Sequence, residues 1–455
     1  MFVDFLLDRF RASATLDALV WRDRAYPYSW LLEAVDGWTA RLAAARVTPG
    51  TVVSLEADFS PTSVALLLAL IEHGCTVVPL TTSVDSKKPE FRDIAEVETQ
   101  IQLDRDDTPI IQPLDRVARH EVLVRLKAIG HPGLALFSSG STGKSKAAVH
   151  DFVPLLEKFK TPRHVYRTIS FLLFDHIGGV NTLLYTLSNG GCVVTVEDRA
   201  PDTVCAAIAR HGVQLLPTSP TFINLLLLSE AYRRHDLASL RMVTYGTEVM
   251  PESTLRRFHE LFPHIALLQT YGLSEVGILR SRSRSSDSLW VRIGGAGFQT
   301  RIVEGMLEIQ AQSAMLGYLN APSPFTADGW FRTGDVVETD GEWIRILGRR
   351  SELINVGGEK VYPAEVESVL QLMEGVEDVT VSAEPSPITG QLIQARVKLS
   401  TCETRAEFAA RMRAFCADRL PRFKVPQKVV LVTEAMHGSR FKKLRVTEPA
   451  TRGHA

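Results

Sequence analysis

Apolar residues in the first 280 positions follow two alternating spacings. Residues 29–45 and 63–73 show the spacing of a helix, whereas 51–55 and 76–80 are short continuous apolar runs of the kind found in buried strands. Gly74 ends the second helix before the following run. Comparable runs recur at 168–174, 192–196, 213–217, 241–245 and 265–269. The alternation predicts an α/β fold of layered, mostly parallel sheets.

The pattern changes after about residue 285, where short strands with many glycines predict a β-rich segment that closes a large domain. Beyond Arg349 the pattern predicts a small α+β unit. Its expected elements are a helix at 364–373, strands at 377–383 and 391–399, a helix at 404–418 and a strand at 427–432. Since 455 residues exceed one ordinary domain, we expect an N-terminal domain of residues 1–349 and a C-terminal domain of residues 350–455.

Composition excludes several classes of protein. The 51 basic and 52 acidic residues give a net charge of -1, so no overall field favours nucleic acid or an anionic membrane. The five cysteines are odd in number and form no CxxC pair, which argues against a zinc site or a disulfide framework. The apolar run 64–71 is too short to span a membrane, and the N-terminus does not resemble a secretory signal. These features predict a soluble cytoplasmic protein.

The densest chemical signal is the segment FSSGSTGKSK at residues 137–146, which follows a predicted strand. Glycines let the backbone approach an anion, while hydroxyls, amides and lysines can bind phosphate oxygens. A P-loop requires GxxxxGK[ST], but Ser138 stands where its first glycine belongs. The phosphate loop of adenylate-forming enzymes, roughly [ST]SG[ST]TGxPK, fits except that Ser145 replaces proline. A flexible Ser/Gly linker is the third interpretation.

Further motifs favour the second interpretation. They are FDH at 174–176, QTYGLSE at 269–275, GWFRTGD at 329–335, GRRSELINVGGEK at 348–360, LPRFKVP at 420–426 and KKLR at 442–445. In this order and spacing the chain resembles the acyl-adenylate-forming superfamily of acyl- and aryl-CoA ligases, carrier-protein adenylation domains and beetle luciferases. The resemblance implies a large N-terminal domain with a small, mobile C-terminal lid. It also implies that ATP and a carboxylic acid form an acyl-adenylate and pyrophosphate, after which the acyl group passes to coenzyme A.

The resemblance also implies roles for individual residues. Glu275 and Thr142 would hold Mg²⁺, Tyr271 would lie along the adenine, Asp335 and Arg349 would bind the ribose, and His176 would line the acyl pocket. The remaining nucleotide- or cofactor-binding residues that it implies are Ser138, Ser139, Gly140, Ser141, Gly143, Lys146, Gly246, Thr247, Glu248, Gly272, Ser274, Gly358 and Lys360.

The family's C-terminal lysine bridges the carboxylate and the α-phosphate during adenylation. The spacing to Arg445 assigns this role to Lys442. Phe441 stands where the family has glycine, which leaves Lys443 as an alternative. For the second step the family rotates its small domain, bringing the segment near Gly358 to the site. Ser351 occupies the hinge position, which is usually Asp or Lys.

The motifs say less about the acid substrate and the thiol acceptor than about the nucleotide. The position where amino-acid-activating relatives carry an aspartate falls at Gly178, which disfavours an α-amino acid unless the register shifts to Asp175. A fatty and an aromatic acid are not distinguished. The segment 423–426 favours coenzyme A over the phosphopantetheine of a carrier protein. The alternatives are a stand-alone enzyme that loads a carrier protein, a non-catalytic nucleotide-binding relative and a P-loop NTPase. A monomer or a homodimer is expected.

Overall fold

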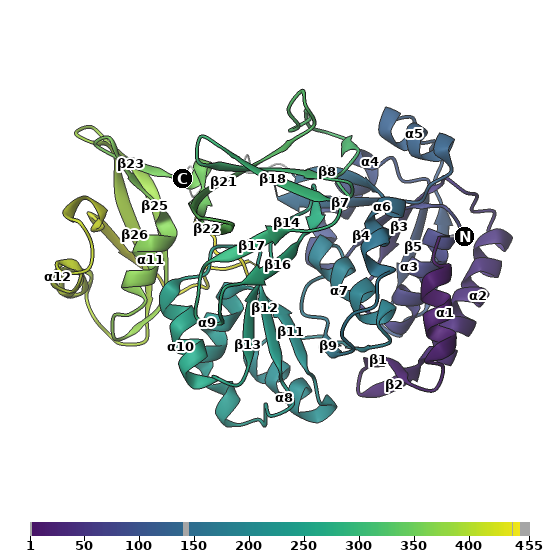
Figure 1. Cartoon of the computed structure of the whole chain (residues 1–455), viewed down its shortest axis with the longest axis horizontal. Helices are drawn as coiled ribbons and strands as arrows, with labels where there is room; N and C mark the ends of the chain where they lie inside the picture. Colours follow the sequence, from purple (N-terminus) through teal and green to yellow (C-terminus); the bar gives the residue numbers. More distant parts are fainter. Residues whose placement is uncertain (1, 140–144, 439, 446–455) are drawn as a thin grey trace, which may run out of the picture.

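The computed structural model describes residues 2–139, 145–438 and 440–445 of the chain. It has mixed α/β architecture, with a large N-terminal domain and a small C-terminal domain at one end of the long axis (Figure 1). Two seven-stranded sheets and one six-stranded sheet make up the framework of the large domain, and a five-stranded sheet is the framework of the small domain.

The first seven-stranded sheet has the order β20-β8-β7-β4-β3-β5-β6. Its inner strands β7, β4, β3 and β5 are parallel, while β8, β20 and β6 pair antiparallel. The strands are β3 (Val52–Glu56), β4 (Thr76–Leu80), β5 (Thr99–Leu103), β6 (Pro109–Pro113), β7 (Gly133–Ser139), β8 (Ser145–Asp151) and β20 (Gly317–Tyr318). The outer face is covered by α4 (Lys88–Ile94) and α5 (Glu121–Ile129).

The second seven-stranded sheet has the order β13-β12-β11-β9-β10-β1-β2 and is parallel except for β2. Its strands are β1 (Asp17–Trp21), β2 (Arg24–Pro27), β9 (Arg167–Ile169), β10 (Cys192–Val194), β11 (Leu215–Thr218), β12 (Met242–Tyr245) and β13 (Ala266–Gln269). Its outer face packs on α8 (Pro201–His211), α9 (Pro220–Ser229) and α10 (Glu252–Leu261).

One apolar core joins the two sheets. It contains side chains from both sheets and from the helices between them, α1 (Asp4–Ala12), α2 (Tyr28–Ala44), α3 (Pro61–Glu72) and α7 (Ile177–Ser188). The apolar run 64–71 is buried in α3, which begins with a capping box between Ser60 and Ser63. Helix α6 (Phe152–Leu156) adds Leu155 and Leu156 to this core. The largest body of buried apolar surface therefore fixes the two sheets relative to each other.

The β-rich segment predicted from the glycine-rich pattern is confirmed. It forms an antiparallel sheet of order β16-β17-β22-β21-β19-β18, preceded by the short hairpin β14-β15. Its strands are β14 (Gly272–Leu273), β15 (Gly277–Ile278), β16 (Arg280–Ser283), β17 (Val291–Gly294), β18 (Phe298–Val303), β19 (Met306–Ala311), β21 (Phe331–Asp340) and β22 (Trp343–Arg349).

The small domain has its own sheet and core. The strands are β23 (Ile354–Val356), β24 (Glu359–Val361), β25 (Val376–Ser386), β26 (Gly390–Leu399) and β27 (Lys428–Leu431), and the helices are α11 (Pro363–Leu370) and α12 (Arg405–Cys416). These agree with the expected α+β pattern. A short 3-10 helix, η4 (Arg350–Glu352), separates β22 from β23. The exact domain limits 1–349 and 350–455 stay a prediction.

One expected strand is shorter than its apolar run. Residues 168–174 were expected to form a strand, but β9 ends at Ile169. Phe171 and Phe174 are buried in a loop that leads to α7. Their apolar character reflects packing rather than sheet pairing, because periodicity does not distinguish a buried loop from a buried strand.

The structure also bears on two predictions from composition, one about the cysteines and one about membrane-spanning helices. Cys75, Cys192, Cys205 and Cys416 are buried free thiols, while Cys402 is exposed. Burial raises the pKa of Cys75, Cys192 and Cys205 to about 12. Within the described residues, no helix combines the length and the apolarity that crossing a bilayer requires.

The close contact at the start of α7 gives a stability prediction. A Cβ added at Gly179 would lie 1.9 Å from the backbone oxygen of Leu173, so Gly179→Ala should destabilise the protein by about 1–3 kcal/mol. Gly37, in the exposed middle of α2, has nothing within 4 Å of an added Cβ, so Gly37→Ala should stabilise by about 0.5–1 kcal/mol. Urea unfolding of both variants measures the difference, and equal midpoints would contradict the packing described here.

Candidate functional site

The predicted site residues gather at one edge of the second sheet. The loops after β9, β11, β12 and β13 leave the carboxyl ends of parallel strands, which is where α/β sheets bind ligands. These loops carry His176, Gly246, Thr247, Glu248 and Tyr271. The hairpin β7-β8, the strands β21-β22 and the last described residues of the chain contribute the other groups.

Asp335 is held between an aromatic hydroxyl and a guanidinium. The Tyr271 hydroxyl donates to Asp335 Oδ2 at 2.5 Å, and Arg349 Nε lies 3.4 Å from Oδ1. Asp335 and Arg349 are cross-strand partners on β21 and β22. Burial raises the pKa of Asp335, while Arg349 and the Tyr271 hydroxyl act in the opposite direction. The pairing of β21 with β22 thus places the Asp335 carboxylate, an acceptor, beside the Arg349 guanidinium, a donor. This combination suits recognition of paired hydroxyl groups.

Glu275 is fixed by the strand that extends the first sheet. The Tyr318 hydroxyl donates to Glu275 Oε1 at 2.7 Å, and the Met315 amide donates to the Glu275 backbone oxygen at 2.7 Å. The buried ring of His150 lies between two backbone oxygens, 2.5 Å from that of Ser274 and 3.1 Å from that of Ser313. These contacts tie Glu275 to β8 and β20. Sequence reasoning missed Tyr318 and His150.

The hairpin β7-β8 carries the predicted phosphate loop. Ser138 pairs with Lys146, and Ser139 with Ser145, so the two ends of the loop lie side by side. The Lys146 ammonium is 5.4 Å from the centre of the Tyr318 ring, which is the ring that binds Glu275. Gly140, Ser141, Thr142 and Gly143 lie outside the described residues. The described ends of the loop are therefore close to the predicted metal ligand.

The donor set fits a magnesium ion that keeps substrate phosphates as ligands. Such an ion takes one or two carboxylates from the protein rather than a complete cage. Among the described residues there is no group of three or more His, Cys, Asp or Glu side chains placed to hold a metal. Glu275 supplies one carboxylate, and Thr142, the second predicted ligand, lies outside the described part. One carboxylate, with Lys146 close to the Tyr318 ring that contacts it, is the arrangement expected where a magnesium ion is bound by both the protein and substrate phosphates.

His176 forms the start of α7. Its Nδ1 accepts a hydrogen bond from the Gly178 amide at 3.0 Å. Burial lowers the pKa of His176 well below its usual value, and the charges of Lys442 and Arg440 lower it further. The ring is consequently neutral with its proton on Nε2.

Asp175 is already engaged. Its Oδ2 accepts from Arg440 Nη2 at 3.1 Å and from the Thr81 hydroxyl at 3.0 Å. This carboxylate is thus neutralised by the protein itself. Arg440 is a second residue that sequence reasoning missed, because it reaches Asp175 across 265 positions of sequence.

The segment after β12 is tightly constrained. A Cβ on Gly246 would lie 2.8 Å from the backbone oxygen of Thr270, and Thr247 has a left-handed backbone at φ +74°. Glu248 accepts from the amide of Thr221 at 2.8 Å, from the Thr221 hydroxyl, and from the Lys443 amide at 3.1 Å. Gly272 and Ser274 lie in and beside the hairpin β14-β15 that precedes the six-stranded sheet.

The two candidate lysines point in different directions. The Lys443 side chain is 5% exposed and its ammonium lies 2.8 Å from the Val379 backbone oxygen, 3.6 Å from Glu367 and 3.7 Å from Asp378. These partners all belong to the small domain. Lys443 is therefore turned into that domain.

Lys442 has different surroundings. Burial lowers the pKa of Lys442, and the charges that act on it are those of Arg349, Glu248, Arg440 and Glu275. The Lys442 ammonium thus lies within electrostatic range of four of the predicted or newly found site groups.

Gly358 and Lys360 are not brought to the other predicted residues. Both are exposed on the hairpin β23-β24 of the small domain. The Gly358 amide donates to Asn355 within this hairpin, and a Cβ there would meet open space.

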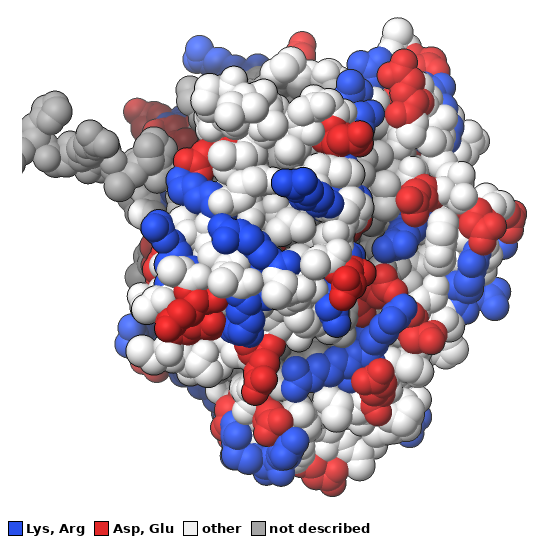
Figure 2. Space-filling view, turned by 90° about the vertical axis from the view of Figure 1, so that its left-hand side faces the viewer, with Lys and Arg blue, Asp and Glu red and all other residues white. Residues whose placement is uncertain are grey.

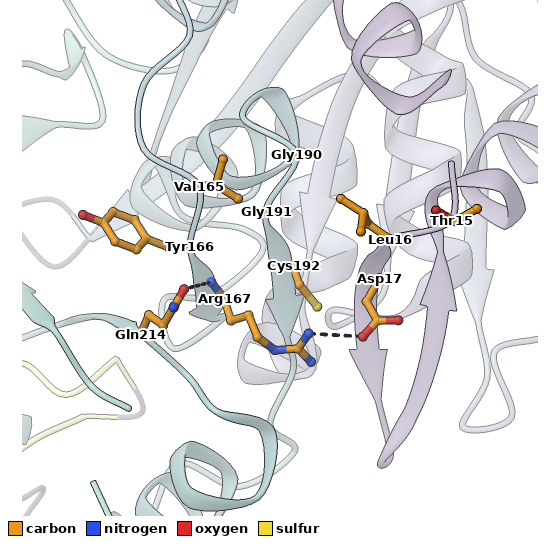
Figure 3. Close-up of a pocket in the computed structure, with 10 residues that line it drawn as sticks. All are labelled: Thr15, Leu16, Asp17, Val165, Tyr166, Arg167, Gly190, Gly191, Cys192 and Gln214. Carbon is orange, nitrogen blue, oxygen red and sulfur yellow. Dashed lines mark hydrogen bonds and ion pairs between the residues drawn. The ribbon is translucent and has the colours of Figure 1, made fainter. Parts of the chain in front are cut away.

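A cavity of about 310 Å³ lies at the opposite end of the second sheet. It opens at the amino ends of β1, β9 and β10, where Arg167 pairs with Asp17 at 3.1 Å and the Arg167 amide donates to Gln214 (Figure 3). The cavity is far from the carboxyl edge along the same strands, and its guanidinium is already paired. It is not the site assembled above.

The face on the side of the small domain carries both signs of charge. Lys and Arg side chains lie among Asp and Glu side chains across it (Figure 2). Several basic groups of the small domain are paired, as Lys424 is with Glu365 at 2.6 Å and Arg411 with Glu403 at 2.7 Å. Positive charge is therefore balanced locally on this face.

Comparison with known proteins gives two family matches. The model described as AMP-binding enzyme matches residues 82–308, and the model described as AMP-binding enzyme C-terminal domain matches residues 365–442. The two matches together cover about two-thirds of the chain and include most of the site residues.

Relatives with established names are CoA ligases. The chain is 27% identical to the 3-[(3aS,4S,7aS)-7a-methyl-1,5-dioxo-octahydro-1H-inden-4-yl]propanoyl:CoA ligase of Mycobacterium tuberculosis, over 91% of this chain and 92% of that protein. It is 29% identical to the ligase of the same name from Rhodococcus jostii, where the match spans 70% of this chain and only 65% of that protein. The structure of the anthranilate CoA ligase AuaEII in complex with anthranoyl-AMP is similar, with a TM-score of 0.83, 20% identity and coverage of 97% and 95% of the two chains.

The Tyr271–Asp335 contact gives a pH prediction. Tyr271→Phe removes a hydrogen bond that lowers the pKa of Asp335, so the pKa of this carboxyl should rise further. Protonation removes the charge of Asp335 and turns one of its acceptor oxygens into a donor, so hydrogen bonds from the two ribose hydroxyls that it is expected to bind would weaken. As the pH is lowered, the affinity for AMP should therefore decrease at a higher pH in the variant than in the wild type, as measured by calorimetric titration.

Tyr232→Phe is the matched control, because Tyr232 packs on Phe262 in the outer core of the second sheet. It should keep the wild-type pH dependence. Identical pH profiles for Tyr271→Phe and the wild type would show that Asp335 does not carry the nucleotide interaction.

Proposed function

Because the chain belongs to the AMP-binding enzyme family, we propose that it is an ATP-dependent ligase that joins a carboxylic acid to the thiol of coenzyme A. In the first step a carboxylate oxygen attacks the α-phosphorus of ATP. The bond to the bridging oxygen of the β-phosphate breaks, and acyl-AMP and pyrophosphate form. In the second step the thiol, losing its proton, attacks the acyl carbon, and AMP leaves as the carbon–oxygen bond breaks.

One observation carries the proposal. The Lys442 ammonium lies within electrostatic range of Glu275, in the β14-β15 hairpin, and of Arg349 in the six-stranded sheet, whereas the Lys443 ammonium contacts the small domain. An ammonium group placed beside a metal ligand and a ribose-binding pair would stabilise the negative charge that grows at the α-phosphorus. The electrostatic arrangement supports adenylation by Lys442 rather than by Lys443.

The nucleotide would be held by groups from several elements of the large domain. We propose that Tyr271 lies along the adenine and that Asp335 and Arg349 bind the ribose. Ser138, Ser139, Lys146 and the loop residues 140–143 would bind the phosphates, since backbone amides and hydroxyls in such a loop donate to oxyanions. Gly246, Thr247 and Glu248 would line the base and acyl side of the cleft, as would Gly272 and Ser274.

Magnesium belongs to the same proposal. When bound, the ion would neutralise phosphate charge, with Glu275 and Thr142 as its ligands from the protein. The hydroxyl of Tyr318 and the His150 ring would keep the Glu275 carboxylate and its backbone in place. Holding the carboxylate before substrate binds reduces the reorganisation that catalysis would otherwise require.

The second step requires a different face of the small domain. Gly358 and Lys360 are exposed on the β23-β24 hairpin, and none of the contacts described above joins them to Lys442. We propose that rotation near Ser351 exchanges Lys442 for the hairpin that carries these two residues. A residue without a side chain, such as Gly358, would leave room for pantetheine. Short hinge segments of this kind absorb large dihedral changes.

The acid is proposed to lack an ammonium group. The charge of Lys442 acts on the neutral His176 ring, the apolar rings of Phe171 and Phe174 are buried in the loop before it, and Asp175 is already paired with Arg440. Asp175 Oδ1 has no hydrogen-bond partner among the described residues, but Arg440 balances the charge of this carboxylate, which disfavours an α-amino group at this position. The relatives named above act on a carboxylic acid attached to a bicyclic ring and on an aromatic acid, so ring-bearing acids are the first to be tried.

Pyrophosphate release with a panel of carboxylic acids, with and without coenzyme A, tests the proposed function. We expect pyrophosphate and AMP with a subset of acids, and an acyl-CoA product only when coenzyme A is present. Acylation of a carrier protein instead of coenzyme A would favour the stand-alone adenylation enzyme. Release of inorganic phosphate, or no AMP with any acid, would contradict adenylation. A cytoplasmic location and a monomeric or homodimeric state remain part of this proposal.

Two variants should separate the half-reactions. Lys442→Ala should lower acid-dependent pyrophosphate exchange by about 10²–10³-fold, because one charged donor is lost, but spare thioester formation from a supplied acyl-adenylate. Gly358→Trp should do the reverse, because its side chain would fill the proposed pantetheine path. Exchange assays and single-turnover thioester assays measure the two steps.

Lys443→Met is the control for Lys442→Ala. Since the Lys443 ammonium contacts only the small domain among the partners described above, its loss should act on the stability of that domain more than on the adenylation rate. If Lys443→Met abolished exchange while Lys442→Ala did not, the roles of the two lysines would be reversed.

A further inference from the structure

Phe441, the residue before Lys442, has an unusual backbone conformation. Its φ is +51°, in the left-handed region that glycine adopts readily and bulky side chains rarely adopt. The family pattern that the sequence resembles has glycine here. The backbone therefore keeps a conformation suited to glycine although the side chain is that of phenylalanine, and some other interaction must offset this strain.

The ring of Phe441 is packed against the large domain. It lies 5.2 Å from the ring of Phe171 and 5.7 Å from that of Phe222, measured between ring centres. The guanidinium of Arg199 is 5.5 Å from the Phe441 ring and 5.9 Å from the Phe171 ring. We name Phe171, Phe222 and Arg199 the aromatic pocket. His437, from the same terminal segment as Phe441, stacks on the ring at 5.2 Å.

Polar contacts hold the neighbouring backbone in the same place. The Ser219 hydroxyl donates to the Phe441 backbone oxygen at 2.8 Å, and the same oxygen atom of Ser219 caps α9 by accepting from the Phe222 amide. Arg440 pairs with Asp175, and the Lys443 amide donates to Glu248. Each residue adjacent to Lys442 is thus attached to the large domain.

The other end of this segment is attached to the small domain. Arg445 forms two hydrogen bonds to Glu367 at 2.9 Å each and one to Glu352 at 3.0 Å. Residues 440–445, the lysine segment, consequently connect the two domains. Of the contacts with the large domain, the one that buries apolar surface is that of Phe441, and it is the contact that a glycine could not make.

We propose that Phe441 is a positioning residue that docks the lysine segment on the large domain. Its ring must enter the aromatic pocket for Lys442 to reach the cleft, and it must leave the pocket before the small domain can turn for the thioester step. This inference rests on the proposed function. The inference adds a specific docking residue to that function. The packing of the Phe441 ring in the aromatic pocket would control how easily the two domains separate.

Phe441→Ala tests the proposal through the two half-reactions. Adenylation should fall by about tenfold or more, because the packing of the partly buried ring is lost while the strained backbone remains. The fall should appear in kcat, with the KM for ATP little changed, since ATP is bound by the large domain. Thioester formation from supplied acyl-adenylate should be unchanged or faster. Equal loss in both half-reactions, or no loss in adenylation, would overturn the proposal.

Phe441→Gly separates strain from contact. Glycine removes the ring but adopts the observed φ without strain, so this variant should retain more adenylation than Phe441→Ala. Phe415→Ala is the matched control, because Phe415 packs on the core of the small domain with Arg419 over its ring at 4.1 Å. It should leave the ratio of the two half-reactions at the wild-type value. A change of that ratio in Phe415→Ala equal to that in Phe441→Ala would overturn the specific role of Phe441.

A distance measurement gives a readout that needs no turnover. Cys402 is exposed in the small domain, and the other four cysteines are buried, so one spin label can be placed there and a second on Leu261→Cys at the end of α10. We expect one dominant distance in this labelled parent and a broader distribution after Phe441→Ala. An unchanged distribution would overturn the docking role. A broadened distribution in a protein that adenylates no acid would support docking while contradicting the proposed function.

Discussion

The position of Lys442 depends on a buried carboxylate in the small domain. Glu367 is 1% exposed and receives two hydrogen bonds from Arg445, with the Lys443 ammonium 3.6 Å away. Burial alone would raise the pKa of Glu367, but Arg445 and Lys443 hold it at about 2. The group is therefore ionised at any pH at which the protein works. Removing one member of such a pair typically costs about 3–5 kcal/mol, because a charge is left buried without its partner.

This arrangement divides the site into a fixed and a movable part. Glu275, Asp335 and the phosphate hairpin are each held by contacts between two elements of the large domain. Lys442 is positioned through its neighbours. Arg440, Phe441 and the Lys443 amide contact the large domain, whereas the Lys443 ammonium and Arg445 contact the small domain. In the proposed mechanism, the groups that would bind metal and nucleotide could therefore stay in place while Lys442 is withdrawn.

Local patterns predicted much of the fold, because the apolar runs of β4 and α3 and the glycine-rich texture of the six-stranded sheet are short-range signals. These patterns predicted too long a strand at 168–174, because Phe171 and Phe174 are apolar side chains that pack in the core from a loop. In the proposed site, the motifs singled out Tyr271, Glu275 and Asp335, whose roles stay predictions. The sequence did not single out three further residues, Tyr318, His150 and Arg440. Their partners are brought near them only by the pairing of distant strands and by the docking of residues 440–445. For the same reason the sequence left Lys442 and Lys443 as alternative candidates, and the structure supports the proposal for Lys442 by turning the Lys443 ammonium into the small domain.

The burial of the cysteines bears on the chemical selectivity of such an enzyme. An acyl-adenylate is a strong electrophile, and any nearby thiolate would compete for its acyl group. Cys75, Cys192 and Cys205 are kept as thiols by a pKa of about 12, and Cys416 is also buried with a raised pKa. Burial and a raised pKa both disfavour acylation of these four thiols, which leaves Cys402 as the exposed cysteine of the chain.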